Sequence, residues 1–339
     1  MSTLVEVSKR AGVSTATVSN VITGAVNVSP GLQKRVLAAI EELDYHPNLV
    51  ARSLKLKRTR LLGMVVSDIT NPFFPLMVRG AEDVALENNY LLITFNTDDQ
   101  VERERKVLTA LRSRRVDGIL LVISPNPEAP SHIEKAMRAG IPLVCLDRMP
   151  VGFEADSVTV DNPGGAFRCV QHLLSLGHRR VAIVNGPEAM PIAAERFEGY
   201  RRALEAAGLP VDPALVRRGD FRVESGYILG RELLTMSDRP SAIFTTNNNM
   251  ALGVLGALEE LGMSYPRDVA LAVFDDLPFA SSFRSRLTAV SNPAYAIGQK
   301  GAELLLRRIE GKEAATEPVS IRLETELIVR ESSVGPAAG

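Results

Sequence analysis

The sequence predicts a small all-α head followed by an α/β core of two doubly wound lobes, each built on a parallel sheet. Three observations support this prediction. Apolar residues recur at helical spacing through residues 1–45. From Arg60 onward, short apolar runs typical of strands alternate with helical patterns. The runs between residues 60 and 333 are more numerous than one sheet commonly holds.

The head, residues 1–46, is expected to form three short helices. Gly12 breaks the first helical pattern, and the Ser14 side chain can cap the helix that follows. Ser29 and Pro30 open the third helix, with serine as its cap and proline at its first position. The apolar positions at helical spacing are Leu4, Val7 and Ala11, then Val18, Val21 and Ile22, then Val36, Ala39, Ile40 and Leu43.

The core is expected to alternate strands and helices. Eight runs are typical of strands: LLGMVVSDI, YLLITFNTD, DGILLVIS, IPLVCLD, DSVTVDN, RRVAIVNG, SAIFTTNN and DVALAVFDD. Helical patterns such as PLMVRGAEDVALENN and AAERFEGYRRALEAAG lie between most of them. This alternation predicts parallel sheets that helices cover on both faces.

In the head, a helix, a tight glycine turn and a second helix form the pattern of a helix-turn-helix. Small hydroxyl side chains lie on or beside the second helix: Ser14, Thr15, Thr17 and Ser19. Such side chains let a helix approach DNA closely and bond to phosphates or bases. Residues 1–60 hold nine Lys or Arg against four Asp or Glu, whereas the remaining 279 residues hold 30 against 36. A basic head on an acidic body favours DNA binding over the alternative, a plain three-helix bundle.

The composition argues against a membrane protein, an enzyme and a metalloprotein. No apolar run approaches the roughly 18 residues that a membrane span needs, and the N-terminus lacks a signal peptide, so we expect a cytoplasmic protein. Cys145 and Cys169 have no close-spaced partner, and the four histidines show no metal-ligand spacing. No phosphate-binding loop, dinucleotide motif or nucleophile elbow is present. We therefore expect neither catalysis nor a cofactor.

The head contains the stretch TLVEVSKRAGVSTATVSNVITG, followed by LDYHPNLVARSLK. Through these motifs it resembles the head of the lactose/galactose repressor (LacI/GalR) family. In the core, NPFFP, RVDGIL, LGHRR, RFEGY, NMALG and FDD match further landmarks, so the resemblance covers essentially the whole chain. It implies a helix-turn-helix repressor with a periplasmic-binding-protein-like core. Such a protein binds a pseudo-palindromic operator as a homodimer and responds to a small effector between its lobes.

The resemblance also implies which residues contact DNA. Thr15, Ala16 and Asn20 would meet base edges in the major groove, where an asparagine can bond adenine in a bidentate manner. Phosphate contacts and further contacts would come from Thr3, Ser14, Thr17, Ser19, Asn27, Ser29 and Ala51.

A short hinge helix is expected to follow the head. In the family, a leucine of this helix enters the minor groove at the operator centre, and Leu54 occupies its place. Arg52 and Lys55 would bind nearby phosphates. A helix of about two turns is marginal alone, so we expect it to form only on DNA. The alternative is a flexible basic tether.

Polar and aromatic side chains follow the predicted strands of the core, where open α/β sheets bind ligands. Carboxylates and amides bond hydroxyls while aromatic faces cover C–H surfaces, which predicts a sugar or sugar derivative. In the family these positions line the effector cleft: Phe73, Phe74, Asp147, Asp161, Arg196, Phe221, Asn247 and Asp275. Asp161 has a second interpretation, as the cap of the helix that Asn162-Pro163-Gly164-Gly165 begins. That segment has two of its own, a helix start or an anion site.

Two positions depart from the family's pattern. Asn247-Asn248-Asn249 stands where the family has Asn-Asp, which weakens any expectation of charge there. Met190 stands where purine-responsive members carry arginine, and methionine cannot donate a forked pair of hydrogen bonds. We therefore expect a sugar before a purine or nucleoside. The sequence also leaves open control by a phosphocarrier protein, and an enzyme or binding protein that merely carries this head.

The expected organisation is a head (1–46), a hinge helix and linker (47–59), a core (60–333) and a disordered tail (334–339). Lobe one is expected over about 60–161 and 292–320, and lobe two over 162–291 and 321–333, with crossovers near 161–163, 290–293 and 320–322. No heptad repeat follows the core, which predicts a dimer and not a tetramer. Leu252, on a helix expected over 250–262, is the candidate interface residue, and Leu255 and Leu258 either join it or only cover the sheet.

Overall fold

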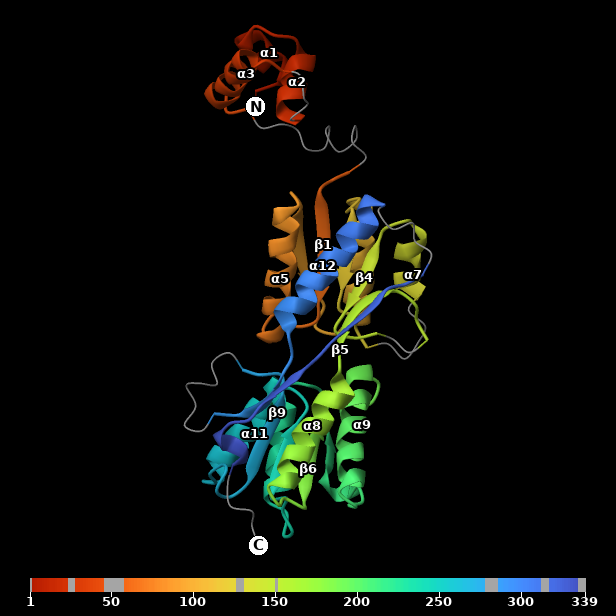
Figure 1. Cartoon of the computed structure of the whole chain (residues 1–339), viewed down its shortest axis with the longest axis vertical. Helices are drawn as coiled ribbons and strands as arrows, with labels where there is room; N and C mark the ends of the chain where they lie inside the picture. The colour runs from red at the N-terminus through yellow and green to blue at the C-terminus, as the bar shows by residue number, and fades with distance from the viewer. Residues whose placement is uncertain are drawn as a thin grey trace. The chain divides into compact units, whose positions relative to one another are not determined.

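The computed structural model divides the chain into two compact units, residues 1–60 and 61–339 (Figure 1). The described residues are 2–23, 28–45, 58–125, 131–149, 152–277, 286–311 and 317–334. Residues 47–57 of the expected hinge, and all of the expected tail except Val334, lie outside the described residues.

The first unit contains the three expected helices, α1 (Leu4–Ala11), α2 (Thr15–Thr23) and α3 (Pro30–Glu42). The residues at helical spacing pack together in one small core. Val7, Val18 and Val36, one from each helix, are fully buried. Arg35 of α3 holds the turn between α1 and α2, because its guanidinium donates to the Ala11 carbonyl oxygen at 2.5 Å.

The second unit contains two six-stranded sheets, one in each lobe. The first sheet has β1 (Leu61–Val66), β2 (Leu91–Asn96), β3 (Gly118–Leu121), β4 (Leu143–Leu146), β5 (Asp156–Val160) and β11 (Ser320–Leu323), in the order β11-β5-β4-β3-β1-β2. The second has β6 (Val181–Asn185), β7 (Val216–Arg218), β8 (Ala242–Thr245), β9 (Ala270–Phe274), β10 (Thr288–Ser291) and β12 (Glu326–Ile328), in the order β12-β10-β9-β8-β6-β7. All pairs are parallel except β10–β12. The prediction of two doubly wound parallel-sheet lobes is confirmed.

Four strands lie outside the eight runs that the sequence pattern singled out: β7, β10, β11 and β12. Each has only three or four residues. Three of them are partly exposed along their length, so they lack the apolar run that marks a buried strand.

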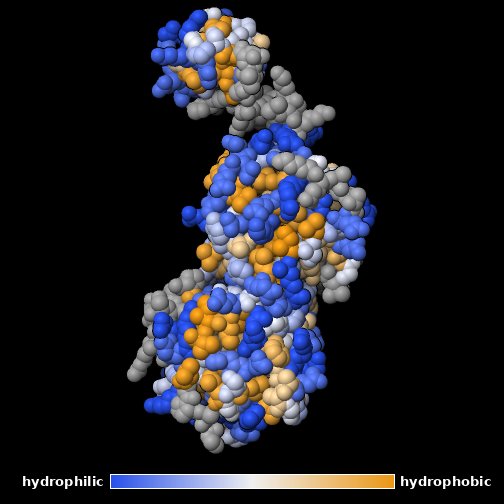
Figure 2. Space-filling view, viewed as in Figure 1, coloured by the Kyte–Doolittle hydropathy of each residue, from blue (hydrophilic) through white to orange (hydrophobic). Residues whose placement is uncertain are grey.

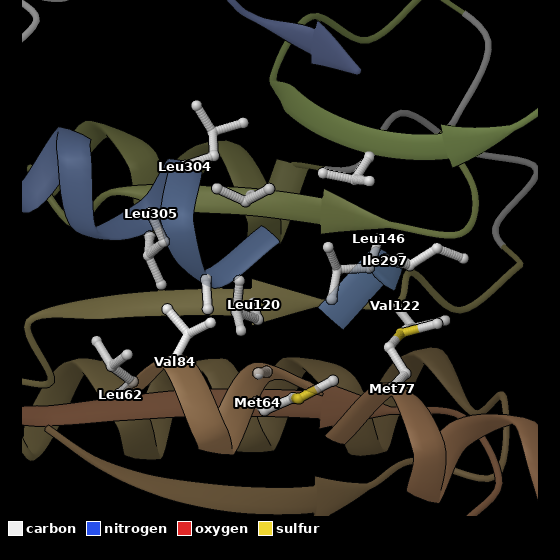
Figure 3. Packing of buried hydrophobic residues seen from close by; sticks show 14 of the residues in the cluster. Leu62, Met64, Met77, Val84, Leu120, Val122, Leu146, Ile297, Leu304 and Leu305 are labelled. Atoms are coloured by element: carbon white, nitrogen blue, oxygen red, sulfur yellow. The ribbon is translucent and has the colours of Figure 1, made fainter. Parts of the chain in front are cut away.

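Helices cover both faces of each sheet. In the first lobe, α5 (Phe73–Glu87) and α12 (Ala294–Glu310) cover one face, and α6 (Val101–Ser113) and α7 (Ser131–Arg138) the other. In the second lobe, α8 (Asn162–Ser175) and α9 (Pro191–Ala206) face α10 (Val223–Leu234) and α11 (Asn248–Glu260) across the sheet. Two 3-10 turns are added at Pro213–Leu215 and Glu331–Ser333. Figure 3 shows side chains of α5 and α12 meeting those of the strands beneath them.

The described chain crosses between the lobes at three places. The first crossing follows β5, and the second lies between β10 and α12. The third lies at residues 324–325, between β11 and β12. The expected third crossing near 320–322, and the expected end of lobe one at 320, were too early. The reason is that Ser320–Leu323 pair with β5 as the edge strand of the first sheet.

None of the described helices is long and apolar enough to cross a membrane. Cys145 and Cys169 are free thiols in the cores of the two lobes, and burial raises the pKa of both. In the parts of the chain that the structure describes, no three His, Cys, Asp or Glu side chains gather as a metal site would require.

In each lobe, helices approach so closely that only glycine fits at their contact. In the first lobe, a Cβ on Gly298 of α12 would lie 1.9 Å from the Met77 carbonyl oxygen of α5. In the second lobe, a Cβ on Gly253 of α11 would lie 2.1 Å from the Val223 carbonyl oxygen of α10. Because the obstacle is backbone in both cases, no side-chain rotation can relieve the clash.

We predict that Gly253→Ala destabilises the protein by about 2 kcal/mol or more, since α10 and α11 must move apart. Gly256→Ala is the matched control in the same helix, because its new methyl group meets only a Tyr227 ring carbon at 3.7 Å. That control should be neutral or stabilising by up to about 1 kcal/mol, the helix-propensity gain. Urea unfolding of both variants measures the difference, and equal stabilities would contradict the backbone contact.

Candidate functional site

The second helix of the head, α2, exposes the residues expected to contact DNA. Thr15, Ala16 and Asn20 are exposed, and Thr17 and Ser19 are half-buried. Val18 is fully buried and packs with Val21 and Ile22 in the head core, as the sequence pattern predicts. Of the expected DNA-contacting residues, Asn27, Ala51, Arg52, Leu54 and Lys55 lie outside the described residues.

Two hydroxyls of the head have capping roles. Thr3 is the N-cap of α1, and a reciprocal capping box joins it to Glu6. The Ser14 hydroxyl accepts from the Thr17 amide at 3.1 Å at the start of α2, as expected of a cap. Ser29 stands at the N-cap of α3, but the expected capping bond is absent there. Its hydroxyl is exposed, which is what a phosphate contact needs.

The charge expected of the head belongs to the segment that follows it. Residues 1–45 hold four Lys or Arg and four Asp or Glu, so this part has no net charge. Arg10 forms an ion pair with Glu42 at 2.7 Å, and Arg35 is engaged with the α1–α2 turn. The net charge of +5 in residues 1–60 comes entirely from residues 46–60.

A cleft with about 550 Å³ of open volume lies between the two lobes of the second unit. It is bounded by segments that follow the carboxyl ends of strands in both lobes. Seven of the eight expected effector residues line it: Phe73, Phe74, Asp147, Arg196, Phe221, Asn247 and Asp275. All are buried except Phe221, which is half-buried.

Asp161, which was expected to bind the effector, is not among the residues that line the cleft. Its carboxylate caps α8 by accepting from the Gly164 amide at 3.0 Å. It also accepts from Arg322 at 3.0 Å and pairs with Arg168 at 3.5 Å. A carboxylate already occupies the start of α8, so the Asn162-Pro163-Gly164-Gly165 segment is a helix start and not an anion site.

Arg196 is the best-anchored cation of the cleft. It is 2% exposed, and its guanidinium donates to Asn162 Oδ1 at 2.9 Å and to the Thr246 carbonyl oxygen at 2.5 Å. Its Nη1 lies 3.4 Å from Asp275 Oδ2, and the guanidinium stacks 3.8 Å from the centre of the Phe274 ring. This network fixes the direction of the Asp275 carboxylate at the cleft wall.

Eight lining residues were missed by the sequence interpretation: Asp68, Asn71, Asp99, Arg148, Ile192, Asp220, Arg222 and Asn249. Arg148 is the most informative, because it directly follows Asp147 at the same strand end. A search that took two residues after each strand would have found it. Asp68 and Asn71 could have been found in the same way, because they lie in the loop that leads from β1 to Phe73.

Four residues of the cleft hold a left-handed backbone conformation that side chains rarely adopt. The φ angles are 58° at Asp99, 69° at Asp147, 66° at Phe221 and 70° at Asp275. Such residues cost of order 1–3 kcal/mol each and gather at functional sites. Space for the Phe221 ring depends on Gly186, where a Cβ would lie 2.0 Å from a ring carbon.

The two departures from the family's pattern both lie at contacts between the lobes. Met190 is 2% exposed, and its Sδ lies 2.9 Å from Arg148 Nη1. Asn248 is fully buried and donates to Asn71 Oδ1 at 3.0 Å. This lobe-to-lobe bond is neutral, whereas an aspartate at position 248 would bring a charge.

The chain matches two known families. Residues 3–48 match the bacterial regulatory proteins of the lacI family, and residues 170–333 match the periplasmic binding protein-like domain. The ribose operon repressor of Escherichia coli (strain K12) is 37% identical over 91% of this chain and 93% of its own. Catabolite control protein A of Priestia megaterium is 35% identical over 98% and 99%. The transcriptional repressor PurR of Vibrio vulnificus (strain CMCP6) is 33% identical over 98% of both chains.

Solved structures that cover nearly the whole chain include the following two. One is the complex of the transcriptional regulator CelR with cellobiose, at 35% identity and a TM-score of 0.74, covering 98% of this chain and 100% of that one. The other is the lac repressor dimer bound to operator and an anti-inducer, at 26% identity and a TM-score of 0.86, covering 98% and 99%.

Asp147 generates a prediction about stability and pH. Burial raises the pKa of its carboxyl to about 6, with Asp275 and Asp99 adding to the rise and Arg148 and Arg196 opposing it. In the unfolded chain the pKa is about 3.9. Because the folded pKa is raised, the protein loses stability as pH rises through 6. Asp147→Asn should therefore stabilise the protein by about 2 kcal/mol more at pH 7.5 than at pH 4.5.

Urea unfolding of wild type and Asp147→Asn at both pH values measures this difference. Asp220→Asn, which removes an exposed carboxylate of the same cleft, is the control for lost charge alone. A stability difference between wild type and Asp147→Asn that is the same at both pH values would contradict the raised pKa.

Proposed function

The chain belongs to the lacI family of bacterial regulatory proteins, and we propose that it is a repressor that binds a pseudo-palindromic operator as a homodimer. A small sugar that binds between its lobes would raise or lower its affinity for the operator. The family consists of transcription regulators and not of enzymes. Such a protein acts where the chromosome is, in the cytoplasm. The observation that carries the proposal is the cleft, which joins seven buried or half-buried ligand-type side chains from both lobes.

The proposed DNA interface is the outer face of α2 together with residues 47–59. Thr15, Ala16 and Asn20 are exposed there and suit contacts to base edges. Leu54 would enter the minor groove, and the cations around it would neutralise phosphates. A two-fold dimer presents two copies of α2, which is why the operator should be a pseudo-palindrome. The lac repressor, solved as a dimer on its operator, supports this arrangement.

The proposed dimer face is the exposed apolar surface of both lobes. Ile69 and Leu76 of the first lobe are 45% and 46% exposed, and Val223 and Ile228 of α10 are 46% and 48% exposed. Figure 2 shows apolar surface on both lobes of the viewed face. On α11, Leu252 and Leu255 are half-buried and remain interface candidates, whereas Leu258 is 1% exposed and belongs to the core.

We infer a neutral monosaccharide as the effector. The cleft presents five carboxylates, Asp68, Asp99, Asp147, Asp220 and Asp275, against three arginines, Arg148, Arg196 and Arg222. An excess of carboxylates disfavours phosphates and sugar acids but suits hydroxyls, which donate to carboxylates. The aromatic rings of the cleft can cover the apolar face of a sugar ring. The similarity to a ribose operon repressor makes ribose the first sugar to test.

The residues of the cleft also argue against the two other regulators that the sequence left open, a phosphocarrier protein and a purine. A phosphocarrier protein would need no polar ligand cleft, yet this cleft is lined by charges and amides. A purine would need forked donors at position 190, where Met190 instead contacts Arg148. We therefore propose the sugar over both.

Asn20 tests the DNA interface. Asn20→Ala should change the preferred base at one position in each half-site, by about 1–3 kcal/mol. Ser29→Ala removes an exposed hydroxyl that makes no capping bond, and it should weaken binding to all DNA sequences by a similar factor. Selection from randomised DNA with wild type and both variants gives the three consensus sequences. An unchanged consensus for Asn20→Ala would show that α2 does not place this residue on a base.

Arg196 tests the effector site. Arg196→Ala should lower the affinity for ribose by at least about tenfold, because buried partners are left unpaired. Operator affinity should stay as in wild type. Arg201→Ala is the control, since Arg201 lies on the same helix and is exposed. Because Arg196 also supports the fold, the affinity for ribose is measured in Phe221→Ala as well, which removes a half-buried ring of the cleft.

Calorimetry with ribose and other neutral monosaccharides, together with operator binding by fluorescence anisotropy, provides the measurements. Unchanged sugar affinity in a folded Arg196→Ala protein would remove this residue from the site. Failure of wild type to bind any neutral monosaccharide would overturn the proposed effector class.

A further inference from the structure

A second cavity lies between the lobes beside the cleft, with about 590 Å³ of open volume. The two cavities share three lining residues, Asp147, Arg148 and Ile192. The rest of the second cavity is lined by Met149, Ser157, Thr159, Val160, Pro191, Glu195, Ser320 and Arg322. These three residues therefore lie where the two cavities adjoin, and we refer to them as the wall.

The wall is rigid because Arg148 is held from several sides. Its Nη2 donates to the Ser67 hydroxyl at 2.7 Å, and its Nη1 donates to Asp99 Oδ1 at 3.1 Å. The same Nη1 lies 2.9 Å from Met190 Sδ, which belongs to the other lobe. Ile192, at the start of α9, adds an apolar side chain that is 7% exposed.

The second cavity has the chemistry to receive a further hydroxylated ring. Ser157, Thr159 and Ser320 bring hydroxyls from β5 and β11. Glu195 and Arg322 add one charge of each sign. Among the described residues, the lining of the second cavity includes no aromatic side chain, whereas the cleft has three, Phe73, Phe74 and Phe221. A sugar ring would therefore occupy the cleft first and reach the second cavity only as part of a longer ligand.

We propose that Arg148 and Ile192 set the length of the effector, so that the cleft accepts one sugar ring and excludes a second ring linked to it. The inference rests on the proposed sugar effector and deepens it. Specificity arises by exclusion, because a disaccharide must displace a guanidinium that has three partners. Cutting the wall back should join the cavities and admit the longer ligand.

The test measures ligand length in the full chain by calorimetry. Two matched probe pairs are used, ribose with a ribosyl-ribose disaccharide and glucose with cellobiose, and the pair whose single ring binds wild type is followed. Wild type should bind the single ring and bind its extended partner at least about tenfold more weakly. Ile192→Ala should raise affinity for the extended probe about tenfold relative to affinity for the single ring.

A second substitution locates the gain. Thr159→Trp, placed in the Ile192→Ala protein, should fill the second cavity, remove the gain and leave the single ring bound. Arg148→Ala provides an independent opening of the wall if Ile192→Ala lowers the melting temperature too far.

The outcomes separate the two proposals. If wild type binds a single ring and no wall variant gains affinity for its extended partner, the partition is wrong while the sugar effector stands. Equal binding of both probes by wild type would also overturn the partition. If wild type binds no neutral monosaccharide, the effector proposal fails and the partition falls with it.

Discussion

The interlobe region depends on the buried guanidinium of Arg196. A cation removed from water is costly unless its partners are held in good geometry. Here the partners are Asn162 just after β5, the carbonyl oxygen of Thr246 after β8 and the carboxylate of Asp275 after β9. Three segments far apart in sequence must keep their positions for this one side chain. The cleft is built on that constraint, because its walls are the same strand ends.

The cleft carries two features that oppose folding. Asp147 is buried with a raised pKa, and four lining residues hold strained backbone angles. Both features oppose folding, so the surrounding lobes have to supply the stability. Close backbone packing at Gly298 and Gly253 supplies part of it. Rigid lobes thus carry a strained binding surface.

Periodicity and strand ends made most of the fold and cleft predictable. Buried strands are visible in the sequence as apolar runs, and the residues that follow such strands lie together at one edge of an open parallel sheet. Asp161 shows the limit, since a carboxylate after a strand can serve a ligand or a helix start, and only the position of Arg322 and Arg168 decides. The short strand β11 has no apolar run, so the third crossing was misplaced. Arg148 was missed because only the first residue after β4 was taken as a site candidate, and sequence spacing does not encode its contact with Met190 of the other lobe.

The net positive charge of the first 60 residues lies in the linker and not in the helical head. The five excess cations of the first 60 residues are Arg52, Lys55, Lys57, Arg58 and Arg60, while residues 1–45 are neutral overall. Sequence-independent attraction to DNA comes from counterion release. In the proposed complex this attraction would come mainly from the linker of each subunit, whereas the choice of sequence would rest on α2. A substitution in one segment would then alter either the search along DNA or the sequence preference without altering the other.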